Sequence, residues 1–301
     1  MRRKMVTGEI WMNHTKIFTE EVSYNSNLLN EIDAMKEVLD KSLTKVNFEK
    51  IWKIDMHSNT HHSTAIEGNK LEQHDSEILY DTYGAWKSEE LFGITQEEFQ
   101  KTLKSKCSKK DCLEVLLHLN AYQYTEKLFT SKGLKNLIEE DIIHLNTCIL
   151  GCRENRRVEV QNLGMSNYRR IPVHVRGSST VRPYPWELPA IMNKFIEWTN
   201  YELERKKYHP VVLSAQIHSK FLHIHPFSDG NGRTARLLLL LSTCDLGYYG
   251  VKIHKQNRSE YMNLLEELQN GKPKFYYDFI LKNNLDFMKS VLEKLNWIKH
   301  G

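Results

Sequence analysis

Residues 223–247 have the sequence HIHPFSDGNGRTARLLLLLSTCDLG, and this stretch decides the fold. Its proline and glycines predict a helix that ends near Leu222, a short loop, and a second helix that begins near Asn231. Five consecutive leucines place this second helix in a hydrophobic core, and Gly247 marks its end. The centre of the molecule is therefore expected to be a helix–loop–helix unit.

Apolar residues recur at helical spacing on both sides of this unit. Residues 19–45, for example, carry Leu28, Ile32 and Met35 at intervals of four and three. The same spacing predicts further helices at 51–68, 74–87, 96–106, 111–131, 138–150, 187–205, 210–223, 231–246, 257–270 and 274–295. The expected fold class is all-α.

Residues 168–182, YRRIPVHVRGSSTVR, break this helical pattern. Ile171, Val173 and Val175 alternate with polar residues before a Gly-Ser-Ser turn, which predicts one β-hairpin. The positive charge of this region has two interpretations. It can be a solvated surface with no partner, or it can bind a partner, for which a peptide or a phosphate is favoured. Seven of the thirteen arginines lie in the hairpin or just before it: Arg153, Arg156, Arg157, Arg169, Arg170, Arg176 and Arg182.

The composition bounds the class of protein. The chain has 301 residues, with 42 Lys+Arg against 38 Asp+Glu and 40% hydrophobic residues. These values exclude a disordered chain, and the near-neutral charge argues against a nucleic-acid partner. No apolar run approaches the roughly 20 residues of a membrane helix, and the opening has no signal-peptide core. Because the five cysteines also fit a reducing compartment, we expect a cytoplasmic protein without a membrane partner.

The loop between the two central helices carries the chemistry. Gly230, Asn231 and Gly232 allow backbone N–H groups to converge at a helix N-terminus, which attracts anions. Arg233 and Arg236 add two guanidinium groups on the first turn, where a cation is unfavourable by about 0.3–1 kcal/mol. This placement indicates a bound anion, and a polyphosphate fits.

Asp229 and His225 complete this constellation. A carboxylate beside a phosphate site repels the phosphate unless a hard cation such as Mg²⁺ lies between them. His225 is a candidate general base, because the ordinary pKa of histidine lies near working pH. Together these groups describe phosphoryl or nucleotidyl transfer to an external nucleophile.

Two metal sites are alternative interpretations. The first would serve a metal-dependent hydrolase but leaves both arginines and the glycine loop unexplained. Its ligands would be His223, His225 and Asp229, with His218. The second lacks an evident fourth ligand, and buried thiols are common in helix cores. It comprises three residues on one helical face: His144, Cys148 and Cys152.

The pattern His225-Pro-Phe-x-Asp229-Gly-Asn-Gly-Arg-x-x-Arg236 resembles the full signature of the Fic (filamentation induced by cAMP) family. Members of that family usually transfer AMP from ATP to a protein hydroxyl group. The resemblance extends over about residues 50–285. It implies an all-α Fic-type core whose hairpin at 168–182 is the flap that docks the target protein, and it implies a homodimer.

The resemblance also implies a role for each residue of the signature. His225 would deprotonate a Ser, Thr or Tyr hydroxyl, and Asp229 would hold Mg²⁺ between the α- and β-phosphates. Arg233 would bind the α- and β-phosphates, and Arg236 the γ-phosphate. A glycine at position 232, where Doc-type kinases carry lysine, favours AMP transfer over phosphorylation. The anion hole would be formed by Gly230, Asn231 and Gly232.

Two regions depart from the family pattern. In the implied adenine pocket, Tyr261 matches the family aromatic residue, while Met262 and Gln269 replace a frequent tyrosine and asparagine. Tyr261 and Gln269 are the expected base-binding residues. Because Met262 and Gln269 depart from the family pattern, the sequence does not fix selectivity for the adenine base of ATP. The segment 85–112 is longer than is usual for the family and has no assigned role.

Glu67 lies in the last turn of the helix predicted at 51–68, with Gly68 as its left-handed end. A carboxylate there opposes the negative end of the helix dipole and requires a positive partner. Ser63 lies one turn earlier and could steady the carboxylate. Ser63-x-x-x-Glu67-Gly68 also resembles the inhibitory-helix motif of Fic proteins. This resemblance implies that Glu67 pairs with Arg236, blocks the γ-phosphate, and positions water for the removal of AMP.

The resemblance divides the chain into a helical extension at 1–50, the inhibitory and connecting helices at 51–117, and a catalytic core at 118–295. The expected function is an autoinhibited protein adenylyltransferase that uses Mg²⁺ and ATP and also removes AMP. A nucleotide-binding regulatory module that never transfers AMP is the alternative from a different functional class.

Overall fold

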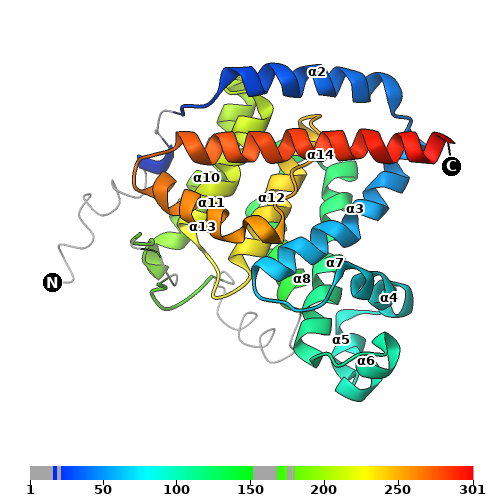
Figure 1. Cartoon of the computed structure of the whole chain (residues 1–301). Coiled ribbons are helices and arrows are strands. Elements are labelled where there is room, and N and C mark those ends of the chain that lie inside the picture. The colour runs from blue at the N-terminus through cyan, green and yellow to red at the C-terminus, as the bar shows by residue number, and fades with distance from the viewer. Residues whose placement is uncertain (1–15, 19–21, 152–167, 175–177, 179, 301) are drawn as a thin grey trace.

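The computed structural model describes residues 16–18, 22–151, 168–174, 178 and 180–300. Two helices, α11 (Pro210–Ile224) and α12 (Asn231–Asp245), form its centre (Figure 1). Nearly every side chain of both helices is buried, including all five consecutive leucines of α12. The expected helix–loop–helix unit is therefore the core of the molecule.

Three helices cover the central pair. Helices α7 (Lys109–Ser131) and α8 (Glu139–Leu150) pack against α12, and α10 (Leu188–Arg205) packs against α11. The buried side chains of α10 follow the predicted helical spacing: Leu188, Ile191, Met192, Phe195 and Trp198.

A layer of two long helices closes one side of the core. Helix α14 (Lys274–His300) packs against α11 and against α13 (Arg258–Gln269). Helix α2 (Ser26–Ser42) lies along α14 and runs in the same direction (Figure 1). Their beginnings are joined where the Asn25 N–H donates to Asp278 Oδ1 at 2.7 Å.

Helix α3 (Lys45–Ile66) brings residue Glu67 to the core. It packs against α7, α14 and α4 (Gln73–Tyr83). Its last turn is closed by the N–H groups of Glu67 and Gly68, each 3.0 Å from a carbonyl of the preceding turn. Gly68 has a φ of +100°, which favours glycine at this position.

The segment 85–112 is a packed part of the fold. It forms α5 (Ser88–Gly93), α6 (Gln96–Leu103) and the start of α7, and with α4 it makes the lobe that projects beside α7 (Figure 1). Thr95 and Glu98 cap α6 reciprocally, at 3.2 and 2.6 Å. Phe99 is fully buried, so this insertion contributes its own apolar contacts to the core.

Short 3₁₀ turns complete the described part of the chain: η1 (Lys16–Phe18), η2 (Leu134–Asn136), η3 (Pro185–Glu187) and η4 (Lys255–Asn257). A search of the described helices finds none with the length and apolarity that a membrane span requires.

The β-hairpin predicted at 168–182 is not seen, because the described residues of this segment form no strand. Residues 175–177 and 179 lie outside the described part. Arg169 donates to the Pro183 carbonyl at 2.5 Å, and Arg182 donates to the Leu222 carbonyl at 3.2 Å. An isolated two-stranded hairpin is marginal in water, and these buried arginines anchor the described residues of the segment to carbonyl groups of the core.

Candidate active site

His225 ends α11 and begins the loop of the site. Its backbone is left-handed, with a φ of 52°, and its N–H donates to the Phe221 carbonyl at 2.9 Å. Arg169 holds this turn from the neighbouring segment. The Arg169 Nε donates to the His225 carbonyl at 2.8 Å, and its backbone N–H donates to the Pro226 carbonyl at 2.9 Å. The backbone that carries the imidazole is therefore fixed from both sides.

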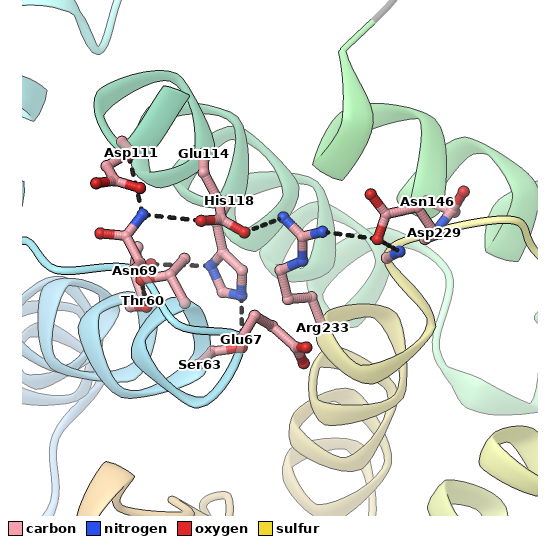
Figure 2. Close-up of polar contacts among 12 residues, drawn as sticks. Thr60, Ser63, Glu67, Asn69, Asp111, Glu114, His118, Asn146, Asp229 and Arg233 are labelled. Atoms are coloured by element: carbon pink, nitrogen blue, oxygen red, sulfur yellow. Dashed lines mark hydrogen bonds and ion pairs between the residues drawn. The ribbon is translucent and has the colours of Figure 1, made fainter. Parts of the chain in front are cut away.

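Two asparagines hold the rest of the loop. Asn231 exchanges two hydrogen bonds with the backbone of Phe227, at 3.0 and 2.8 Å. Asn146 of α8 donates to the Asp229 carbonyl at 3.0 Å (Figure 2). Gly230 has a φ of +77°, and a Cβ there would lie 2.7 Å from the Asn146 amide nitrogen. The loop therefore holds the N-terminal turn of α12 in place, and such a helix end can attract an anion.

Arg236 is buried and is held by the C-terminal turn of α3. Its Nη2 donates to Glu67 Oε1 at 2.7 Å and to the Ser63 carbonyl at 2.9 Å. Ser63, expected to steady the carboxylate, offers its hydroxyl to the guanidinium: Arg236 Nε donates to Ser63 Oγ at 2.9 Å. His118 of α7 contacts the same hydroxyl at 2.9 Å (Figure 2). The positive partner required by Glu67 is thus Arg236.

Gly232 makes room for Glu67. A Cβ at position 232 would lie 2.4 Å from Glu67 Oε1 and 3.1 Å from Arg236 Nη1. A side chain at 232 and the observed place of Glu67 therefore exclude each other. The Glu67 carboxylate lies beside the first turn of α12, and the N-terminal end of a helix attracts negative charge.

Arg233 is buried between two carboxylates (Figure 2). Its Nη1 donates to Glu114 Oε1 of α7 at 2.6 Å, and its Nη2 lies 3.3 Å from Asp229 Oδ1. The Asp229 side chain is 71% exposed. An exposed carboxylate beside a buried arginine fits a Mg²⁺ ion that would keep several water ligands.

The His225 imidazole is neutral at pH 7. Burial lowers the pKa of His225 to about 4, and the positive charges of Arg182 and Arg169 act in the same direction. The ring can therefore accept a proton from a substrate at neutral pH.

The Glu67 carboxylate is ionised. Burial would raise the pKa of Glu67, but the charges of Arg236, Arg233 and Arg258 hold it below its ordinary value. Arg258 also donates its Nε to the Ile66 carbonyl at 2.6 Å. The positive charge needed at the end of α3 is therefore supplied by α12 and α13.

His218 belongs to a chain of buried hydrogen bonds that reaches Arg236 through Tyr261. The His218 Nε2 lies 3.0 Å from the Tyr261 hydroxyl, and its Nδ1 lies 2.6 Å from the Tyr276 hydroxyl. Burial lowers the pKa of His218 to about 3, so the ring is neutral and both nitrogens are engaged.

We predict that acid destabilises the protein through His218. The unfolded chain binds this proton near pH 6.5 and the folded chain only near pH 3, so stability present above pH 6.5 is lost as the pH falls. The loss is about 1.4 kcal/mol per pH unit, or roughly 2 kcal/mol between pH 6.5 and 5. Urea unfolding at both pH values measures it, and His218→Gln, which does not titrate, should lose that much less. Equal losses in the two proteins would contradict the prediction.

The geometry does not support the metal-hydrolase interpretation. Among the described residues, no group of three His, Cys, Asp or Glu side chains could hold a metal ion. Of the four expected ligands, His218 has both nitrogens directed to tyrosine hydroxyls. In the second set, Cys152 lies outside the described residues, and the His144 ring packs edge-on against Tyr124 at 4.5 Å.

The two expected base-binding residues lie in different surroundings. Tyr261 is fully buried, and its hydroxyl interacts with His218 and Arg236. The Gln269 side-chain oxygen is buried, with no hydrogen-bond partner in the described part of the chain. The structure thus places Tyr261 beside Arg236 and leaves the side-chain oxygen of Gln269 without a hydrogen-bond partner among the described residues.

Several polar residues of the site escaped the sequence reading. They lie far from the signature in sequence, on helices or, for Asn69, in the loop after α3, so the spacing of the motif carries no information about them. The signal that could have pointed to them is a polar side chain on the inner, otherwise apolar face of a predicted helix or at the end of that helix. These residues are Asn69, Glu114, His118 and Asn146.

The sequence of the chain is similar to members of a known family. Residues 136–242 match the Fic/DOC family. The protein adenylyltransferase Fic of Aedes aegypti is 29% identical over 248 residues, which cover 82% of this chain and 43% of that protein. The protein of the same name from Drosophila grimshawi is 31% identical over 220 residues, which cover 73% and 39%. The chain spans about two fifths of the length of these curated relatives.

Solved structures share the fold. A Fic domain-containing signalling protein from Bacteroides thetaiotaomicron matches with a TM-score of 0.67 and 22% identity, covering 90% of this chain and 97% of that chain. Fic-1 from C. elegans matches with a TM-score of 0.69 and 20% identity, covering 89% and 71%. With the signature loop, the helical core and these relatives in agreement, the chain belongs to the Fic/DOC family.

Proposed function

We propose that this chain transfers AMP from ATP to a Ser, Thr or Tyr hydroxyl of a target protein, and that Glu67 restrains the transfer. The pair between Glu67 and Arg236, 2.7 Å apart, carries the proposal. A carboxylate on a guanidinium at the N-terminal turn of a helix occupies the place of a phosphate and competes with it. The relatives named protein adenylyltransferase support a nucleotide as the source of that phosphate.

The chemistry follows from the charges of the site. The neutral His225 removes the proton of the target hydroxyl, and the hydroxyl oxygen attacks the α-phosphorus of ATP. The bond from that phosphorus to the β-phosphate oxygen breaks, and pyrophosphate leaves. Arg233 and Arg236 hold the phosphates, and the N–H groups at the start of α12 stabilise the charge that develops on the oxygens. Asp229 would hold Mg²⁺, which neutralises phosphate charge when it is bound.

The target is proposed to dock along the segment 168–182. The start of this segment lies against the loop of the site, because the Arg169 Nε donates to the His225 carbonyl at 2.8 Å. Large apolar side chains in and just after it are exposed: Ile171, Val181 and Trp186. Exposed apolar groups beside a catalytic base are suited to hold a peptide in place.

Two finer features also belong to the proposal. The glycine at position 232 favours AMP transfer over phosphorylation, and the family resemblance favours a homodimer. For removal of AMP, Glu67 would orient a water molecule toward the phosphorus of the AMP-modified protein. The water would give a proton to the Glu67 carboxylate as its oxygen bonds to that phosphorus. The bond from the phosphorus to the protein oxygen would break, and that oxygen would leave with a proton that His225 has taken up from solvent.

We predict that Glu67→Gly raises AMP transfer. Loss of a hydrogen bond between charged groups, worth about 1.5–3 kcal/mol, frees Arg236 for the nucleotide and corresponds to roughly a tenfold to hundredfold increase. The measurement is self-modification with ATP labelled at the α-phosphate. A parallel reaction with label at the γ-phosphate separates the two transfers, since AMP transfer retains only the α-label.

A matched control is Glu72→Gly. Glu72 is exposed, carries the same carboxylate and pairs with Lys255 at 3.1 Å, so its loss should leave labelling at the wild-type level. Retention of γ-label would show a kinase. A Glu67→Gly variant that binds ATP and transfers no label to itself or to a lysate would favour the regulatory nucleotide-binding module.

A further inference from the structure

We propose that Glu114 is a positioning residue for Arg233, and that Asn69 makes this positioning depend on the segment that carries Glu67. The proposal rests on the proposed function only in taking ATP as the ligand. Its test measures ATP binding, while the proposed function is tested by label transfer.

Glu114 and Arg233 form a buried ion pair between two helices of the core. Glu114 lies on α7 and Arg233 on the first turn of α12, and the pair joins residues 119 positions apart at 2.6 Å. Both side chains are largely buried. A buried carboxylate and guanidinium that hydrogen-bond each other are costly to separate, because either charge left alone in the interior is unfavourable. Glu114 therefore fixes one edge of the guanidinium.

Glu114 holds the Nη1 edge of the Arg233 guanidinium, so the Nη2 edge is directed toward Asp229 and the loop where the phosphates are proposed to bind. Arg233 Nη2 lies 3.3 Å from Asp229 Oδ1, on the exposed carboxylate that borders the loop (Figure 2). An arginine held in this way has little rotational freedom to lose when a phosphate binds. Glu114 thus prepares Arg233 for the ligand without touching the ligand itself.

The second oxygen of Glu114 is held by the segment that follows the inhibitory turn. Asn69 Nδ2 donates to Glu114 Oε2 at 2.9 Å and to the Asp111 carbonyl at 3.0 Å (Figure 2). The Asn69 Oδ1 accepts the N–H of Leu71 at 3.0 Å. Turning the amide over would break all three contacts, so Asn69 can only offer Glu114 a donor.

Asn69 connects Glu114 to Glu67 through the backbone. Its N–H donates to the Thr64 carbonyl at 3.1 Å, in the turn that ends α3 and carries Glu67 two residues earlier. One short segment therefore holds both arginines of the signature, Arg236 directly through Glu67 and Arg233 through Asn69 and Glu114. Movement of Glu67 away from Arg236 is thereby linked to the orientation of Arg233.

The fixed amide of Asn69 allows a test in which a second substitution repairs the first. In Glu114→Gln, the glutamine amide must direct its N–H₂ either at Arg233 or at the Asn69 donor. Both arrangements place donor against donor, so we expect ATP to bind roughly tenfold more weakly. Adding Asn69→Ala removes the competing donor and lets the glutamine oxygen face Arg233, so part of the affinity should return.

The experiment measures the Kd of ATP with Mg²⁺ by calorimetry in the Glu67→Gly protein, alone and with each substitution. Asp141→Ala is the control, because it breaks a comparable ion pair at the end of α7, with Lys132 at 2.5 Å, away from Arg233. It should lower the melting temperature and leave the Kd unchanged. Weaker binding in Glu114→Gln with partial recovery in the double variant supports the proposal. An unchanged Kd, or a further loss in the double variant, overturns it.

Discussion

Replacing His225 with alanine in the Glu67→Gly protein is expected to reduce AMP transfer by roughly a hundredfold to ten-thousandfold, the usual contribution of a positioned general base. Burial and two nearby arginines lower the pKa of His225 to about 4. The imidazole is therefore a free base throughout the neutral range. The measurement is the rate of α-label incorporation.

Two controls make the loss specific to proton transfer. The His225→Ala protein should bind ATP with unchanged affinity, because the phosphates are held by the arginines and by the N-terminal turn of α12. His74→Ala removes an exposed histidine of α4 and should leave labelling unchanged. Equal labelling with and without His225 would remove its role as the base.

The pKa of His225 also predicts how the rate of transfer depends on pH. Protonation of this imidazole should leave the rate of α-label incorporation unchanged from pH 8 to 6 and reduce it only as the pH approaches 4.

Asp55→Ala is expected to lower the free energy of unfolding by about 3–5 kcal/mol, because it leaves a buried lysine without its partner. Asp55 of α3 is 2% exposed, and its Oδ1 accepts from Lys252 at 2.8 Å and from Lys294 of α14 at 2.6 Å. Lys252 is buried as well and also donates to Ser58 at 3.1 Å. This carboxylate therefore ties α3, the helix that directly precedes Glu67, to the outer layer of the fold.

Urea unfolding measures this effect as a shift of the midpoint at a constant slope. Asp55→Asn is the second variant, since it keeps the shape of the side chain and removes only the charge. Glu37→Ala is the control: its carboxylate is 74% exposed and lies 3.8 Å from Lys41, so its loss should cost less than about 0.5 kcal/mol. A loss below about 1 kcal/mol in Asp55→Ala would show that the lysines find other partners or lose their protons.

The helices were predictable because their signals are local. Residues predicted at 111–131, 138–150 and 231–246 form helices at Lys109–Ser131, Glu139–Leu150 and Asn231–Asp245. Spacing of apolar residues and the glycines of the loop suffice for this, since both act within a few residues. The hairpin predicted at 168–182 is not seen among the described residues. Its alternating pattern was real, but the arginines of that segment bind carbonyl groups of the core.

The partners of the two signature arginines could be predicted only in part. The dipole of α3 required a positive group near Glu67, and the family resemblance pointed to Arg236. Nothing in the local sequence pointed from Arg233 to Glu114, because 119 residues separate them and many carboxylates lie on predicted helices. Ser63 was also expected beside the carboxylate of Glu67, whereas its hydroxyl accepts from the guanidinium.

The sequence alone determined the helical fold class, and it led to the proposals of an anion-binding turn at Gly230–Gly232 and of His225 as the base, because these depend on residues close together in the chain. The tertiary structure decided which carboxylate meets which arginine. Glu67 reaches Arg236 across 169 residues, and Glu114 reaches Arg233 across 119, since α3 and α7 both pack against α12. Pairing of charges in a core depends on the packing of whole helices, and packing is a property of the complete chain.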